Sequence, residues 1–174
     1  PRGMLLGALN QRTPGFTLVE ILVVVVIVAV IATIGIPNLI RSRTTANEST
    51  VVGNLRTLTN GLAMYRSTTN AYPTSWLDDM YTNADPDFGP GAFQTDLQAA
   101  PFTTRGYRYQ YAPPAGPPLI TFAMVASPAT LGLTGTRTFW TDHTAEIYHC
   151  IGDAPVTAVP GGVRAVQEPP DPCP

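Results

Sequence analysis

The sequence contains no lysine and few of the side chains on which catalysis and metal binding usually depend. Its 174 residues include ten basic side chains, all of them arginine, and twelve acidic ones, which gives a net charge of −2. That balance excludes a protein that binds nucleic acid through its overall charge and leaves only a local arginine patch for such a role. Two cysteines and two histidines are too few for a zinc finger or an iron–sulfur cluster.

Motifs of the common enzyme classes are also missing. The chain has neither a Gly-rich phosphate loop nor a G-x-S-x-G nucleophile motif. His143 and His149 have Glu146 between them but lack the H-E-x-x-H spacing of a zinc site, so we expect ordinary turn and strand residues there. The sequence therefore predicts neither an enzyme nor a bound metal or cofactor.

What the sequence does contain is one long apolar run. Residues 21–36 include no charged side chain, and adding residues 16–19 extends the stretch to 21 residues, with Thr17 and Glu20 as interruptions near its start. At 1.5 Å per residue such a helix is about 31 Å long, enough to cross the hydrocarbon core of a bilayer. A buried core helix is disfavoured because so small a chain cannot surround it. A cleaved secretory signal is the other alternative, with Ala32 and Gly35 as its small residues.

Charged and helix-breaking residues flank this run. Glu20 places a carboxylate near its start, where a charge at the bilayer centre costs about 3 kcal/mol and is a functional candidate by default. The simpler alternative is an interfacial carboxylate beside the positive end of the helix dipole. Pro37 removes one helical hydrogen bond and loosens the turn before it. Arg12 on one side and Arg41 and Arg43 on the other leave the orientation undecided by charge.

Residues 15–20, Gly-Phe-Thr-Leu-Val-Glu, resemble the processing site of type IV prepilins and of the related pseudopilins of type II secretion. The similarity combines a small residue before a Phe, a Glu four residues after it and an uninterrupted apolar run. Pro37 also falls where many pilins carry a helix-loosening proline. The close resemblance covers residues 15–66 and is patchy beyond them.

The resemblance implies a role for each residue of the motif. Residues 1–15 would be a prepilin leader, which a prepilin peptidase would cut after Gly15 before the new Phe16 amine is methylated. Glu20 would attract the Phe16 amine of a neighbouring subunit, offsetting the cost of a carboxylate in lipid, and the region of Pro37 would loosen as a homo-oligomeric helical filament assembles. The partners implied are the peptidase, an inner-membrane assembly platform and, for the precursor, the membrane.

The start of the leader has an alternative. The sequence begins with Pro1 rather than Met, and Met4 is a candidate start that gives a leader of residues 4–15. Cleavage after Gly15 would leave eight arginines and twelve acidic residues, a net charge of −4.

After the apolar run, the pattern changes to an amphipathic helix over residues 38–66. Its apolar side chains recur at spacings of three and four, with Gly53 and Gly61 as weak points. Residues 16–37 of one continuous helix would lie in the membrane or in a filament core, and the second half would support a globular head. Residues 67–70 are expected to end the helix. The recurring apolar positions are Val51, Val52, Leu55, Leu58, Leu62 and Tyr65.

Residues 67–149 are expected to form the globular head. Tyrosines alternate with polar residues from 107 to 111, which predicts one face of a sheet rather than a platform for single-stranded nucleic acid. Five aspartates between residues 78 and 96 could ligate calcium, but solvated loop acids are preferred because no EF-hand spacing is present. The predicted fold is α+β and pilin-like, with about four antiparallel strands packed on the long helix. Strands are expected at residues 107–111, 119–126, 137–140 and 145–150.

Cys150 and Cys173 enclose a tail rich in proline and glycine, which cannot bury a core of its own. A disulfide between them would close 24 residues, stabilise the fold by about 3 kcal/mol and fit an oxidising compartment. Free thiols are the alternative. Such a bridge also resembles the disulfide-closed terminal loop of many pilins, here residues 150–174.

Together these features predict a structural subunit of a type IV pilus-like filament. We expect a single-pass inner-membrane precursor and an extracellular or periplasmic assembly. The alternative is a pseudopilin of a type II secretion system that acts in protein export. Pseudopilin heads more often rely on a calcium loop than on a terminal disulfide, so Cys150 and Cys173 favour the pilin. A third class, a monomeric membrane-anchored binding module, would leave Glu20 without a partner.

Overall fold

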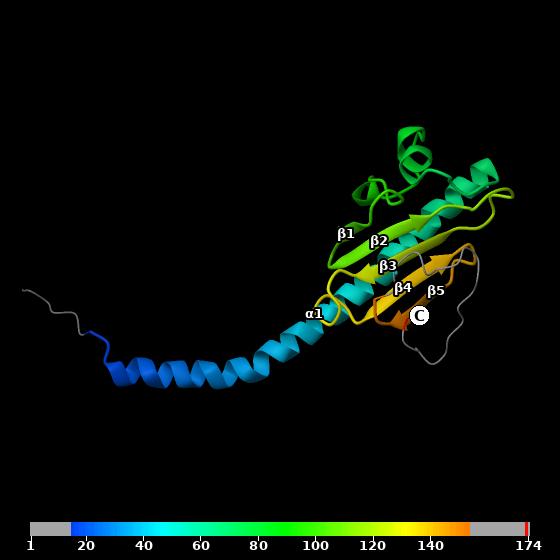
Figure 1. Cartoon of the computed structure of the whole chain (residues 1–174). Helices are drawn as coiled ribbons and strands as arrows, with labels where there is room; N and C mark the ends of the chain where they lie inside the picture. Colours follow the sequence, from blue (N-terminus) through cyan, green and yellow to red (C-terminus); the bar gives the residue numbers. More distant parts are fainter. Residues whose placement is uncertain (1–14, 154–172, 174) are drawn as a thin grey trace, which may run out of the picture. The chain divides into compact units, whose positions relative to one another are not determined.

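The computed structural model describes residues 15–153 and Cys173 (Figure 1). The chain divides into two units, residues 1–39 and residues 40–174. The helix α1, Leu18–Thr69, begins in the first unit and ends in the second. Residues 1–14 of the predicted leader, and residues 154–172 and 174 of the predicted terminal loop, lie outside the described residues.

In the first unit, the described residues of α1 form no buried core. Its large apolar side chains are exposed, from 50% for Ile21 to 81% for Leu18. This helix, with a mean hydropathy of 3.0 over its most apolar eighteen residues, is the one helix in the described chain that is long and apolar enough to cross a membrane. An aliphatic side chain left in water forfeits roughly 1.5–3 kcal/mol of burial energy. An apolar partner, either lipid or protein, must therefore surround this part of α1.

The second unit is a head in which one antiparallel sheet packs on the rest of α1. The strands follow one another in the order β1-β2-β3-β4-β5, so each neighbouring pair is also consecutive in the sequence. Figure 1 shows this meander with α1 behind it. The strands are β1 Phe102–Thr104, β2 Tyr107–Ala112, β3 Ala123–Pro128, β4 Arg137–Asp142 and β5 Ile147–Ile151.

The core lies between α1 and the inner face of this sheet. Leu55 and Leu62 of α1 are fully buried there, two turns apart on one side of the helix. β2 contributes Tyr107, Tyr109 and Tyr111 at alternate positions, and all three are buried. Alternate residues of a strand share a face, as the period of two in the sequence predicted. The α+β fold, a long helix packed on a small antiparallel sheet, is confirmed.

The buried tyrosines keep their hydroxyl groups satisfied. The Tyr107 hydroxyl donates to a β4 carbonyl at 2.9 Å, and the Tyr111 hydroxyl donates to the Pro73 carbonyl at 2.8 Å. The Asn54 amide of α1 donates to the Tyr109 hydroxyl at 2.9 Å. Burial raises the pKa of all three hydroxyls, that of Tyr109 to about 12. The inner face therefore has polar contacts as well as apolar ones, and the Asn54–Tyr109 hydrogen bond joins the sheet to α1.

The outer face of the sheet carries a second, smaller cluster. Val125 and Trp140 are paired on β3 and β4, and both are buried together with Cys150. Tyr148 stacks on Trp140 with ring centroids 5.9 Å apart. Cys150 forms a disulfide with Cys173, whose N–H also donates to the β5 backbone at 2.8 Å. The predicted disulfide is present, and it holds residue 173 against β5.

The segment between α1 and β1 has more structure than the sequence predicted. Asn70 follows the last helical residue with φ 58°, and its N–H donates to the Arg66 carbonyl at 2.8 Å. Asn tolerates this left-handed conformation, which ends helices. Two short helices follow, η1 Asp78–Thr82 and η2 Gly91–Phe93. Each is too short to leave a recognisable period in the sequence.

The strand bounds also differ from the prediction, and β5 begins at Ile147 instead of residue 145. β1 was missed, because three residues cannot show an alternation. The strand expected at residues 119–126 begins at Ala123 instead. Upstream of it, the Leu119 carbonyl accepts the N–H of Tyr72 at 2.8 Å, so this residue pairs with the chain that follows α1 and not with a neighbouring strand.

Candidate functional site

The residues of the prepilin-like motif form the entry to α1. Gly15, Phe16 and Thr17 precede the helix. Thr17 Oγ1 accepts the N–H of Glu20 at 3.2 Å, and the Thr17 carbonyl accepts the N–H of Ile21 at 3.3 Å. Thr17 is therefore the N-cap, and Glu20 is the third residue of the helix. Their T-x-x-E spacing is that of a capping box, a sequence pattern that the prediction of this site overlooked.

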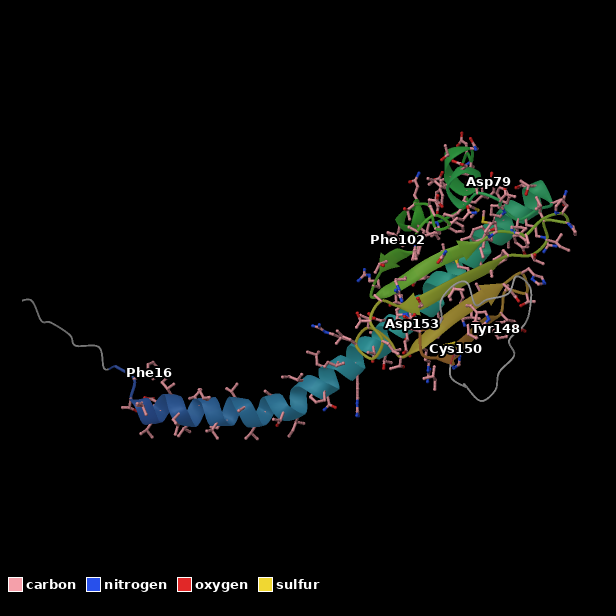
Figure 2. All side chains as sticks on the ribbon, viewed as in Figure 1. Phe16, Asp79, Phe102, Tyr148, Cys150 and Asp153 are labelled. Carbon is pink, nitrogen blue, oxygen red and sulfur yellow. A yellow bond between two sulfur atoms is a disulfide. The ribbon has the colours of Figure 1, made fainter. Side chains whose placement is uncertain are left out.

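Glu20 lies exposed in the first turn of α1, where the N-terminal end of the helix carries partial positive charge. Its carboxylate makes no hydrogen bond or ion pair with any other residue of the described chain. Phe16, just before the helix, is 79% exposed. Figure 2 shows Phe16 at this end and apolar side chains projecting from all sides of the following turns. The segment thus presents one carboxylate within an apolar surface, and attraction to a cation is strengthened in such surroundings.

Pro37 lies inside α1, and the helix continues on both sides of it. Proline has no N–H, so the carbonyl of Thr33, four residues earlier, loses its usual helical partner. The Thr33 hydroxyl donates to the Val30 carbonyl at 2.7 Å. This turn is therefore held by fewer backbone hydrogen bonds than its neighbours.

Loop aspartates of the head serve as local caps. Asp79 accepts the N–H of Thr74 at 2.8 Å and that of the next residue at 3.0 Å, and Asp96 accepts two N–H groups at 2.8 and 3.1 Å. His143 lies in the β4–β5 turn and His149 in β5. Across residues 15–153 and Cys173, no three His, Cys, Asp or Glu side chains lie close enough to hold a metal ion. Asp79 and Asp96 therefore stabilise turns of the described head by accepting backbone N–H groups.

Comparisons with known proteins point to the same segment. The family model of the prokaryotic N-terminal methylation motif matches residues 11–36. The type II secretion system core protein G of Vibrio cholerae is 33% identical over 110 residues, 60% of this chain and 73% of that protein. Its namesake in Aeromonas hydrophila is 38% identical over 66 residues, 38% of this chain and 46% of that protein. The type IV wide pilus major component PilA4 of Thermus thermophilus is 38% identical over 65 residues, 37% of this chain and 50% of that protein.

An exposed apolar helix with a capped, carboxylate-bearing start, together with a β head, is a pilin-like α+β arrangement. More particularly, the chain belongs to the family of type IV pilins and type II secretion pseudopilins, whose members are structural subunits. It spans about half the length of several of the relatives it matches. No solved structure is significantly similar to it.

Proposed function

We propose that the protein is a structural subunit of a type IV pilus-like filament, assembled through α1 after cleavage at Gly15 and methylation of Phe16. The exposed apolar part of α1, beside a Glu20 carboxylate without a partner in the described chain, is the observation that carries this. One surface serves twice: lipid covers it in the precursor, and helices of other copies cover it in the filament. The role is structural and not enzymatic.

The motif residues have separate tasks in this assembly. Cleavage turns Phe16 into the N-terminus, and its methylated amine is the cation for the Glu20 carboxylate of a neighbouring subunit. A carboxylate in an apolar layer is costly unless it is paired, so this contact sets the axial register of the helices. Thr17 holds the backbone of the first turn through its 3.2 Å cap. The turn before Pro37 is where the helix loosens during assembly.

The route to the filament requires partners outside this chain. A prepilin peptidase removes the leader, and an inner-membrane assembly platform collects the single-pass precursor. The Cys150–Cys173 disulfide supports a head that lies in an oxidising compartment, outside the cytoplasm. The assembled filament is extracellular or periplasmic.

Two observations bear on which filament this is. The terminal disulfide supports a surface pilus. The second candidate is a pseudopilin that acts in protein export by type II secretion, and the similarity to core protein G over 73% of the Vibrio cholerae protein supports it mildly. Both candidates use the same helix and motif, so the place of the protein in the cell distinguishes them better than its sequence does.

Intact mass spectrometry of the protein in sheared surface filaments and in the cell envelope tests the proposal. A mass lacking residues 1–15 and carrying one methyl group in the sheared fraction is expected for a pilus subunit. The same mass found only in the envelope would favour the pseudopilin. A full-length mass in the membrane would contradict both, because the motif would then be unused.

A further inference from the structure

The head has two ends, defined by the path of α1 through it. At the basal end α1 enters the head, and the Asn47 amide donates to the carbonyl of Thr134 in the β3–β4 loop at 2.9 Å. At the apical end α1 stops, and the Tyr72 N–H donates to the carbonyl of Leu119 in the β2–β3 connection at 2.8 Å. In Figure 2, Asp153 and Asp79 mark opposite ends of the head.

Arginine gathers at the basal end. Arg43 and Arg105 are exposed there and have no side-chain partner in the described chain. Arg105 lies in the β1–β2 turn, and its neighbour Gly106 packs against Asn47: a Cβ at Gly106 would lie 3.1 Å from the Asn47 amide nitrogen. The two acidic residues of this end already have partners. Glu48 accepts the N–H of Thr136 and forms an ion pair with Arg137, and Asp153 forms an ion pair with Arg108. The basic residues of the basal end are Arg41, Arg43, Arg105, Arg108 and Arg137.

Acidic residues gather at the apical end. Asp85 and Asp87 are exposed and have no hydrogen-bond or ion-pair partner in the described chain. Their loop packs closely on α1. The rings of Phe88 and Tyr65 meet edge-to-face with centroids 5.3 Å apart, and a Cβ at Gly61 would lie 2.5 Å from the Phe88 carbonyl oxygen. The apical charges are Asp78, Asp79, Asp85, Asp87, Asp142 and Glu146, against Arg66.

Arg43 and the point where the acidic loop packs on α1 lie on the same side of the helix. Gly61, which seats the acidic loop, and Arg43 are separated by eighteen residues. At 3.6 residues per turn they are five turns apart and face the same direction, about 27 Å from each other along the axis. A second copy displaced along the axis by roughly that length would bring its Arg43 level with this acidic loop.

We propose that the heads stack end to end, with Asp85 and Asp87 of one copy against Arg43 and Arg105 of another copy of this chain. The inference rests on the proposed filament function and goes further by naming the contact between heads. Matching ends repel and opposite ends attract, so the contact is head-to-tail, and a head-to-tail contact that does not close into a ring builds an open filament. Exposed charge pairs of this kind weaken as salt rises.

Charge reversal in the full-length protein, expressed in its own cell, tests the pairing. Asp85→Arg with Asp87→Arg, or Arg43→Glu with Arg105→Glu, should each lower the subunit in sheared filaments about tenfold or more, since each places like charges opposite one another. All four substitutions together should restore about half or more of the yield, because the pairs are re-formed with opposite sign. Arg56→Glu is the matched control: it reverses an exposed α1 arginine between the two ends and should leave the yield unchanged.

Cross-linking reads the contact directly and does not depend on yield. With Arg43→Cys and Asp87→Cys in one chain, oxidised filaments should run as a ladder of multimers on non-reducing gels and collapse to monomer on reduction. The pair Arg56→Cys and Asp87→Cys should give no ladder. An intact Cys150–Cys173 bridge and normal precursor levels in the membrane would show that each variant folds.

Several outcomes would overturn the proposal. The proposal is wrong if both reversed pairs give a normal filament yield, or if the fourfold variant yields no more than either pair. It is also wrong if the chain with Arg43→Cys and Asp87→Cys gives no ladder. Loss of precursor from the membrane in the Arg43→Glu variant, with no effect of the aspartate pair, would assign Arg43 to lipid phosphate instead. Absence of the wild-type chain from every filament fraction would overturn the proposed function itself, which the intact mass detects independently.

Discussion

The two parts of α1 belong to one helix but differ in how their apolar side chains are removed from water. In the first unit, Leu18, Val26 and Ile31 are all more than half exposed, and apolar residues occupy every side of the helix. In the second unit, the apolar residues form one stripe, and Leu58 is fully buried beneath the sheet. One stripe can be covered by the chain's own strands, whereas a helix that is apolar all round needs a partner on every side.

This difference separates folding from assembly. The head is complete within one chain, because its sheet and the second part of α1 cover each other. The first part of α1 needs an apolar partner that the described chain does not supply. Substitutions in the two parts should therefore show their effects in different experiments.

Leu58→Ala should give the largest change in the stability of the head. It removes a fully buried leucine side chain, which costs about 4 kcal/mol when the cavity does not collapse. Unfolding of the full chain in detergent, followed by the fluorescence of buried Trp76, measures it. Ile27→Ala, at a site 53% exposed, should leave this transition unchanged. Equal losses from the two variants would contradict the division of α1.

Val26→Lys should have the next largest effect, and on insertion rather than on the head. A charge near the centre of a membrane helix costs about 3 kcal/mol. The variant should be extracted from membranes at alkaline pH, while the wild-type chain remains. Thr57→Lys is the control, because Thr57 is an exposed position of the second part of α1. A lysine there should leave the retention of the chain in the membrane unchanged. If Val26→Lys stays in the membrane, the first part of α1 is not surrounded by lipid.

The sequence predicted what depends on local periodicity. The apolar run, the stripe that includes Leu58 and the alternating tyrosines of β2 each show their period within a few residues. β1 could not be predicted, since its three residues are defined by pairing with β2. The Thr17 cap was within reach, because the T-x-x-E spacing stands in the sequence.

The charge separation in the head could not be predicted from the sequence. Arg43 and Arg105 are far apart in the chain: Arg43 lies on α1, and the path of the meander brings Arg105 to the same basal end. Asp85 and Asp87 lie apically because their loop is seated at Gly61, a contact that no local pattern encodes. Assigning a loop to one end of a sheet requires the order and direction of the strands.

Alkaline pH should destabilise the head by a smaller, graded amount. Unfolded tyrosine ionises near pH 10, whereas burial raises the folded pKa of Tyr107, Tyr109 and Tyr111, that of Tyr109 to about 12. The contribution of these tyrosines to the free energy of unfolding is therefore complete below pH 10. As the pH rises toward the folded pKa, this free energy falls by about 1.4 kcal/mol per pH unit for each tyrosine. Denaturant unfolding of the full chain in detergent between pH 9 and 12 measures this loss.

Tyr109→Phe supplies the control for that titration. Removing one hydroxyl should reduce the slope of stability against pH by about 1.4 kcal/mol per unit above pH 10, even though the Asn54 hydrogen bond is also lost. An unchanged slope would mean that Tyr109 titrates alike in the folded and unfolded chain. Membrane insertion, which depends on the first part of α1, should not respond to this substitution.

Thr17→Ala should give the smallest effect, confined to the first turn of α1. Loss of the Oγ1 acceptor for the Glu20 N–H costs about 1 kcal/mol, as removal of an N-cap usually does. Amide hydrogen exchange at Glu20 in the detergent-solubilised chain should become about fivefold faster, the factor that this free energy corresponds to. Thr17→Ser retains the hydroxyl and should restore the wild-type rate. Exchange in β2 should stay constant in both variants, because fraying at the start of α1 leaves the core of the head intact. Unchanged exchange at Glu20 in Thr17→Ala would show that the cap does not stabilise the turn, and faster exchange in β2 would show that the two parts of α1 unfold together.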